Sequence, residues 1–244
     1  GYQDKTIIVE VTEEQAYGST FHVATVKIAT PSQLRTAVSS NKSERDPIEY
    51  FSRGMNAVLL INGDFYTRTS SGNGYVVRQS EVFRWKPSPS TDLLLIDENS
   101  DFHIIRHTGD KNDEEDAVNA FLEQHQMINA FYFGPALVVD GELMEMPDSY
   151  FIGLDGEDPR TAIGQLAPLT YVVVTVDGRI DGSPGVSVKQ LGEYMYGLGC
   201  TQAYALDGGN SSIMVLNHEM LSNKGGYATR GLSDVIYFAT AIDN

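Results

Sequence analysis

The chain has 244 residues, of which 41% are hydrophobic, and it carries a formal net charge of −16. This length supports a substantial core in one or two domains, and no apolar run approaches the roughly 18 residues that a membrane-spanning helix requires. An acidic chain lacks the clustered Lys and Arg that nonspecific nucleic-acid binding needs, so we expect neither a nucleic-acid partner nor a membrane span.

The N-terminal residues show no targeting signal. They lack the basic segment and the apolar segment of a signal peptide, so we expect that a signal was removed before residue 1 or that none existed. We interpret residues 1–19 as an N-terminal extension and residues 20–244 as one domain, because no linker or repeat divides them. Cys200 is the single cysteine, which excludes an intrachain disulfide.

The first half of the chain contains several segments typical of strands. Alternating or continuous apolar residues predict strands at 20–29, 56–61, 91–97 and 102–107, with an extended segment at 31–40. Helices are predicted at 46–54, from its Asp, Pro and Gly punctuation, and at 112–125, from the acidic residues of its first turn.

The second half continues the same pattern. Asp140-Gly141 and Asp177-Gly178 predict hairpin turns, and Ser187 with Gln190 predicts a capping box for a helix over 187–199. A strand at 201–207, a hairpin at 212–221 and a final strand at 233–242 follow. Strands outnumber helices, so we predict an α+β fold: a single domain with a large mixed, mainly antiparallel β-sheet flanked by a few helices.

Common catalytic and metal-binding motifs are missing from the sequence. There is no P-loop, no HExxH, no CxxC and no GxSxG pattern, and GNG at 72–74 is too short for a dinucleotide fingerprint. His103 and His107 would share one face of a strand at a separation of about 13 Å, too far for joint metal ligation without a bend. We interpret them as partly exposed strand residues.

Polar residues gather at the ends of four apolar runs, where loops held by a rigid sheet often carry function. The candidate site residues are Asn62 and Asp64; Arg160 and Thr161; Asp207, Gly208, Gly209, Asn210, Ser211 and Ser212; and Arg230. Each cluster alone is also consistent with ordinary turn chemistry.

Together these clusters combine two kinds of chemistry. The paired carboxylates Asp64 and Asp207 suit glycosidic cleavage. Two arginines, Arg160 and Arg230, suit a phosphate, as does a nest of backbone N–H groups at 208–212 with the two serine hydroxyls. Both sets together would fit a sugar that is joined to a phosphate.

Four segments resemble the phosphodiester glycosidase family in the same order along the chain. They are INGDFY (61–66), PRTAIG (159–164), LDGGNSS (206–212) and TRGLSD (229–234). The resemblance implies a mixed α+β fold, hydrolysis of α-glycosyl 1-phosphodiesters such as those of N-acetylglucosamine, and a site built from the residues named above. Asn210 departs from the family pattern, which usually has a third glycine there.

The resemblance leads to expectations about the cellular location of the enzyme and its cofactor, and it leaves alternative functions open. The chain lacks a cysteine-rich extension and a membrane anchor, so we expect a secreted, periplasmic or cell-surface enzyme rather than a lysosomal one. No cofactor follows from the motifs, although a divalent cation bridging Asp64, Asp207 and a phosphate is conceivable. A metal-dependent phosphodiesterase that cleaves P–O and a non-catalytic glycan-binding protein stay open as alternatives.

Overall fold

The computed structural model describes residues 1–40, 51, 55–64, 72–222 and 231–242. The helix predicted at 46–54 falls almost wholly outside these residues, and so does Arg230. None of the helices in the described ranges is long and apolar enough to cross a membrane.

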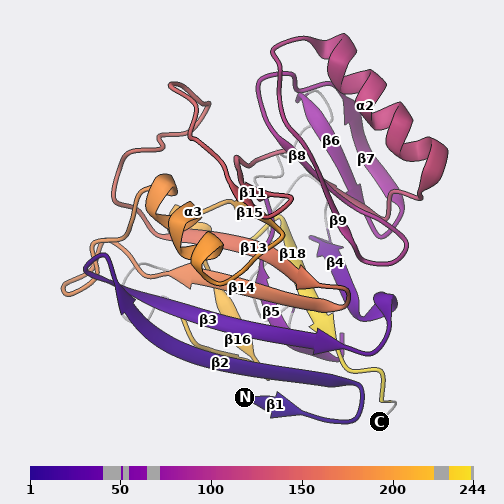
Figure 1. Cartoon of the computed structure of the whole chain (residues 1–244). Helices are drawn as coiled ribbons and strands as arrows, with labels where there is room; N and C mark the ends of the chain where they lie inside the picture. The colour runs from indigo at the N-terminus through magenta and orange to yellow at the C-terminus, as the bar shows by residue number, and fades with distance from the viewer. Residues whose placement is uncertain (41–50, 52–54, 65–71, 223–230, 243–244) are drawn as a thin grey trace.

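The largest sheet has eight strands and forms the lower body of the molecule in Figure 1. Its spatial order is β1 (Tyr2–Gln3), β2 (Ile7–Ala16), β3 (Ser19–Ile28), β14 (Thr170–Val176), β13 (Arg160–Ala167), β15 (Gln202–Leu206), β11 (Ala136–Val139) and β12 (Glu142–Leu143). β2 and β3 pair along their full lengths, so the segment predicted as an N-terminal extension contributes strands to the sheet. The boundary at residue 19 stays a prediction.

Two five-stranded sheets complete the fold. The first has the order β7 (Glu81–Lys86), β6 (Gly74–Arg78), β10 (Asn129–Phe131), β8 (Leu93–Ile96) and β9 (Phe102–Ile105). The second has the order β17 (Glu219–Met220), β16 (Met214–Leu216), β5 (Ala57–Asn62), β18 (Asp234–Ala239) and β4 (Leu34–Val38). A 3-10 turn, η1 (Pro31–Gln33), precedes β4.

Every strand pairing within the described residues is antiparallel. The predicted α+β class with a mainly antiparallel arrangement is confirmed, and the strands divide among three sheets.

The main core lies where the three sheets meet. Alternate residues of β5 point to opposite sides: Leu59 and Ile61 enter the shared core, whereas Leu60 packs in a second cluster. β8 divides in the same way, with Leu94 in the shared core. Both strands are buried on two faces, which explains why their sequences are continuous apolar runs instead of alternating ones.

Two helices cover the outer faces of the sheets (Figure 1). α2 (Lys111–Gln124) packs Val118 and Phe121 against the β6–β9 sheet. α3 (Val188–Gly197) packs Leu191 and Met195 against the eight-stranded sheet. The predicted capping box at the start of α3 is present, with Ser187 Oγ accepting a hydrogen bond from the Gln190 amide at 3.2 Å.

Of the two hairpin turns predicted from Asp-Gly pairs, one is wrong. Asp140-Gly141 joins β11 and β12 as predicted. Asp177-Gly178 instead ends β14, and no strand follows it directly; the next pairing is a single bridge between Ile180 and Ser183. The physical reason is that Asp177 is committed to a buried contact, 2.8 Å from His22 Nε2 on β3.

Candidate active site

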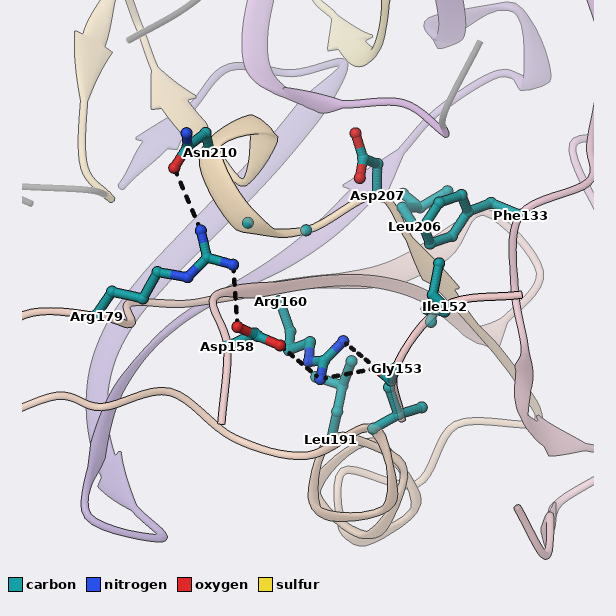
Figure 2. Close-up of a pocket in the computed structure, with 14 residues that line it drawn as sticks. Phe133, Ile152, Gly153, Asp158, Arg160, Arg179, Leu191, Leu206, Asp207 and Asn210 are labelled. Atoms are coloured by element: carbon teal, nitrogen blue, oxygen red, sulfur yellow. Dashed lines mark hydrogen bonds and ion pairs between the residues drawn. The ribbon is translucent and has the colours of Figure 1, made fainter. Parts of the chain in front are cut away.

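A cavity of about 350 Å³ opens beside the end of β15, where the apolar strand stops at Asp207 (Figure 2). Apolar side chains and charged groups share its wall, a composition typical of small-molecule sites. The lining residues are Phe133, Ile152, Gly153, Asp158, Arg160, Arg179, Val188, Leu191, Ala205, Leu206, Asp207, Gly208, Gly209 and Asn210. Of the residues predicted from the sequence, Arg160 and the 207–210 run are therefore brought together here.

The loop after Asp207 requires its two glycines. A Cβ on Gly208 would collide with the carbonyl oxygen of Pro159, and Gly209 has a φ of 58°, in the left-handed region. The chain then forms one 3-10 turn, η2 (Gly209–Ser211). The loop is held against the β13 side by a hydrogen bond from the Gly209 amide to Pro159 O at 3.0 Å.

The predicted anion-binding nest is largely satisfied within the protein. The Ser211 and Ser212 amides donate to Gly208 O and Gly209 O at 3.1 and 3.2 Å, in addition to the Gly209 contact with Pro159. Three of the amides expected to meet a phosphate therefore close the loop itself. Their role is to fix the shape of the cavity wall.

Three further predicted residues form a buried network behind the cavity lining. Asn62 donates from Nδ2 to Asp207 O at 2.7 Å, while its Oδ1 accepts from the Thr161 hydroxyl at 2.8 Å. The single Thr161 hydroxyl proton is shared between Asn62 Oδ1 and Ser212 Oγ, which lies 2.9 Å away, and the Ser212 hydroxyl donates to Arg160 O. These side chains hold the ends of β5, β13 and β15 together and orient Asp207 through its backbone.

The Arg160 side chain lines the cavity but makes its hydrogen bonds mainly to backbone carbonyl groups of the neighbouring loops. Its Nε donates to Val186 O at 3.0 Å, and its Nη2 donates to Gly156 O at 2.8 Å. Burial lowers the pKa of this guanidinium despite the nearby Asp158. Most of its donors are thus used on carbonyl groups, which limits what it can offer to a ligand.

Arg179 is a lining residue that the sequence reasoning missed. Its side chain is 50% exposed, and its guanidinium contacts Asp158 Oδ1 at 3.0 Å and Asn210 Oδ1 at 3.5 Å. Figure 2 shows Arg179 and Asp207 toward opposite ends of the lining, with the glycine loop between them. No local signal marks this arginine, because it lies in the segment read as a hairpin.

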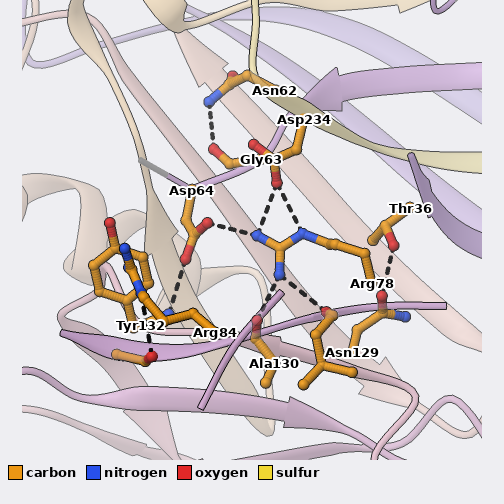
Figure 3. Close-up of polar contacts among 12 residues, drawn as sticks. Thr36, Asn62, Gly63, Asp64, Arg78, Arg84, Asn129, Ala130, Tyr132 and Asp234 are labelled. Carbon is orange, nitrogen blue, oxygen red and sulfur yellow. Dashed lines mark hydrogen bonds and ion pairs between the residues drawn. The ribbon is translucent and has the colours of Figure 1, made fainter. Parts of the chain in front are cut away.

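Asp64 lies in a different environment from Asp207 (Figure 3). Its side chain is 0% exposed, its Oδ1 is 2.6 Å from Arg78 Nη2, and its Oδ2 accepts from the Tyr132 amide at 2.8 Å. The same Nη2 and the Nε of Arg78 donate to Asp234 Oδ2 at 2.8 and 3.0 Å. The predicted catalytic carboxylate is therefore one of three members of a buried Asp64–Arg78–Asp234 triad and does not line the described cavity.

Burial and the neighbouring charges shift the pKa values of two members of the triad. Burial opposes the charge of Arg78, but the two carboxylates outweigh that effect and raise its pKa. Burial, together with the charges of Asp64 and Asp207, raises the pKa of Asp234 to about 7, even though Arg78 lowers it. The influence of Asp207 on Asp234 links the cavity to the triad. Arg78 and Asp234 were not among the predicted site residues. The sequence signal that could have drawn attention to Arg78 is its position as a charged residue at the end of the apolar segment 75–78.

The arrangement can hold an anion and a sugar at once. The net charge of the protein is −16, so its overall electrostatic field repels anions. Arg179 supplies an accessible positive charge that attracts an anion locally to the cavity. Asp207 supplies a carboxylate on the same cavity, and Phe133 supplies an aromatic face. Arg230 lies outside the described residues.

Comparison with known proteins identifies solved structures that share this fold. The chain superposes with a TM-score of 0.71 on the catalytic domain of zebrafish N-acetylglucosamine-1-phosphodiester alpha-N-acetylglucosaminidase, auto-inhibited by its pro-peptide, at 16% identity over 96% of this chain and 83% of that one. A hypothetical protein from Synechocystis gives the same TM-score and identity over 96% and 62% of the two chains. A candidate exported protein from Burkholderia pseudomallei K96243 gives 0.61 at 15% identity over 91% and 74%. At these identities the likeness concerns the fold.

A curated relative and a family model extend the comparison to sequence. An uncharacterized protein of Bacillus subtilis strain 168, YomE, derived from the SPbeta prophage, is 32% identical over 108 residues, which are 44% of this chain and 17% of that protein. The phosphodiester glycosidase model matches residues 55–239, so the resemblance inferred from the motifs is confirmed. Because this match covers well over half of the sequence, the chain belongs to the phosphodiester glycosidase family.

Proposed function

We propose that the chain is a hydrolase that removes a sugar of the N-acetylglucosamine type from a glycosyl 1-phosphodiester, releasing free sugar and a phosphomonoester. Family membership supports a hydrolase acting on glycosyl phosphodiesters. The observation that carries the proposal is the presence of the Asp207 carboxylate and the accessible Arg179 guanidinium on one cavity.

In the proposed reaction Asp207 stabilises or captures the positively charged anomeric carbon as the C–O bond to phosphate breaks. The electron pair of that bond leaves with the phosphate oxygen, and water supplies the hydroxyl of the released sugar. Arg179 binds the phosphate through charge-assisted hydrogen bonds, and Arg160 supplies a second positive charge on the same cavity. To do so, Arg179 exchanges its contact with Asp158 for one with the substrate.

The leaving group reduces the demand for a second catalytic carboxylate. An ordinary glycosidase must protonate a poor alkoxide leaving group. A phosphomonoester has a second pKa of about 6 and leaves as a stable anion. In this proposal Asp64 therefore acts from the buried triad as a positioning residue, which differs from the direct role predicted from the sequence.

The experiment is hydrolysis of UDP-N-acetylglucosamine and simple glycosyl phosphodiesters in ¹⁸O-labelled water, followed by mass spectrometry. Label in the sugar supports the proposal. Label in the phosphate, with sugar 1-phosphate as product, would establish the phosphodiesterase alternative, and binding without turnover across the panel would establish the glycan-binding one. An arm with EDTA tests whether turnover needs a divalent cation, such as one bridging Asp64, Asp207 and the phosphate.

Two variants test whether the Asp207 carboxylate is required for turnover. Asp207→Asn should abolish turnover while the protein still folds. Asp155→Asn is the matched control, since Asp155 is an exposed carboxylate of a neighbouring loop that does not line the cavity. Near-full activity of Asp207→Asn would overturn the assignment.

We also propose that the protein acts outside the cytoplasm, as a secreted, periplasmic or surface enzyme on envelope or host glycans. The fold likeness to a candidate exported protein is consistent with this. Detection of the native protein in culture medium or periplasmic extract, with a cytoplasmic marker as control, tests it; confinement to the marker's fraction would refute it.

A further inference from the structure

A second cluster of ligand-type side chains lies outside the cavity, on the β6–β9 sheet and the helix that covers it. Asp97 follows β8, His103 is on β9, and His125 ends α2. None of these elements contributes a residue to the cavity lining. One donor atom from each of the three side chains lies within 4.8 Å of the others, and no other set of three or more such donors among the described residues meets this criterion.

Asp97 is built to present one oxygen to the two histidines. Its side chain is 1% exposed, and Oδ1 accepts hydrogen bonds from the Asn99 and Asp101 amides at 2.8 and 3.0 Å. The other oxygen, Oδ2, is 2.7 Å from His103 Nε2 and 3.5 Å from His125 Nδ1. The backbone contacts fix the carboxylate, so its remaining oxygen serves as a preorganised ligand.

The histidines are also held in position. Their ring centroids are 4.8 Å apart, and the ring of Phe121 packs on both, at 5.0 Å from His103 and 5.4 Å from His125. Glu98 places Oε1 at 3.1 Å from His125 Nδ1, which adds a second carboxylate beside the three donors. Another His–Asp pair, His22 with Asp177 in the eight-stranded sheet, belongs to no such group of three donors within the described part of the chain.

We infer that Asp97, His103 and His125 form a binding site for a divalent transition metal of the Zn²⁺ class, with Glu98 or water as the fourth ligand. Imidazole and carboxylate donors suit Zn²⁺, which takes four ligands in tetrahedral geometry at about 2.0–2.2 Å. Such donors stand about 3.3 Å apart, so the Asp97–His103 separation of 2.7 Å must open by roughly half an ångström, and the widest separation in the cluster, within 4.8 Å, must close by up to about 1.5 Å. The two imidazoles, at 34% and 28% exposure, have room for these movements.

Metal binding would fasten the end of α2 to the turn between β8 and β9. The sequence did not reveal this site, because it pairs His103 with His107 by spacing. The fold instead places His107 against Asp92, at 2.6 Å, and brings His125 from a different element to His103.

The test is calorimetric titration of the metal-stripped chain of residues 1–244 with ZnCl₂ near neutral pH, with unfolding temperature as a second readout. We expect one site, a Zn²⁺-dependent rise in unfolding temperature, and affinity lowered at least about tenfold in His103→Asn and His125→Asn. Asp97→Asn should also weaken binding, while its amide oxygen can still accept from the Asn99 and Asp101 amides.

His218→Asn is the matched control, because His218 is an exposed histidine in the β16–β17 turn whose positive φ asparagine tolerates. It should bind Zn²⁺ as the unmodified protein does. Co²⁺ should give the intense visible absorption of tetrahedral coordination in the unmodified protein and not in His103→Asn. If one histidine variant folds poorly, the other histidine variant and the Co²⁺ spectrum of the unmodified protein still test the site. Equal Zn²⁺ affinity in the unmodified protein, His103→Asn and His125→Asn would overturn the inference.

Discussion

Replacement of Arg78 by methionine tests whether the buried triad stabilises the site as its geometry implies. The substitution keeps much of the side-chain volume but removes a guanidinium that contacts Asp64 and Asp234 at 2.6 to 3.0 Å and donates to Val77 O and Ala130 O. Two carboxylates, at 0% and 1% side-chain exposure, then face each other without a cation.

The expected cost follows from these contacts. Removing one partner of a buried ion pair destabilises a protein by about 3–5 kcal/mol, because the remaining charge has no water and no counter-ion. At about 2–4 °C per kcal/mol for a domain of this size, the unfolding temperature should fall by roughly 6–20 °C. Arg35→Met, at an exposed position of β4, should change stability by less than about 0.5 kcal/mol.

The loss should also depend on pH with a definite sign. The pKa of Asp234 is raised in the folded state from 3.8 to about 7, so the folded protein binds more protons than the unfolded chain between these values. This contribution to stability is full below about pH 4 and is lost as the pH rises to about 7. Without Arg78 the folded-state pKa rises further, so Arg78→Met should lose more stability at about pH 8 than at about pH 5.

The assay is urea unfolding of the unmodified protein and both variants at the two pH values. The double variant Arg78→Met/Asp234→Asn should recover about 1–3 kcal/mol, because it removes one of the two uncompensated charges. A loss below 1 kcal/mol, or a loss of equal size at both pH values, would refute the reasoning.

Three further predictions concern the cavity and the core. Arg179→Gln should raise KM for a glycosyl phosphodiester by about 10- to 100-fold, since a hydrogen bond to a charged group contributes about 1.5–3 kcal/mol, and should leave binding of the free sugar unchanged; an unaltered KM would exclude Arg179 as a phosphate ligand. Asn210→Gly removes the 3.5 Å contact with Arg179 and should change the ratio of kcat/KM values between two sugars; identical ratios would show that Asn210 does not tune substrate choice. Burial raises the pKa of the Cys200 thiol to about 12, so it should react with a thiol reagent in guanidinium and not in the native protein; fast native labelling would contradict its burial.

Features set by neighbouring residues could be predicted from the sequence. The capping box of Ser187 and Gln190, the Asp140-Gly141 turn and the apolar strands at β5 and β8 depend on local conformational preference and periodicity. The family motifs also carried the α+β class and the cluster of Arg160 with the 207–210 loop. Asn62, Thr161 and Ser212 were correctly grouped, although the structure places them behind the lining as a hydrogen-bonded support.

The tertiary structure alone decided which charged residues meet. Asp64 and Asp207 look alike in sequence, each a carboxylate that follows an apolar strand, yet one is sealed against Arg78 and the other lines a cavity. Arg78 and Asp234 are separated by 156 positions, and Arg179 reaches Asn210 across 31. Local sequence sets backbone conformation through short-range sterics and hydrogen bonds. The environment of a charge depends on which distant strands pack around it, and that is fixed only when the three sheets close over their common core.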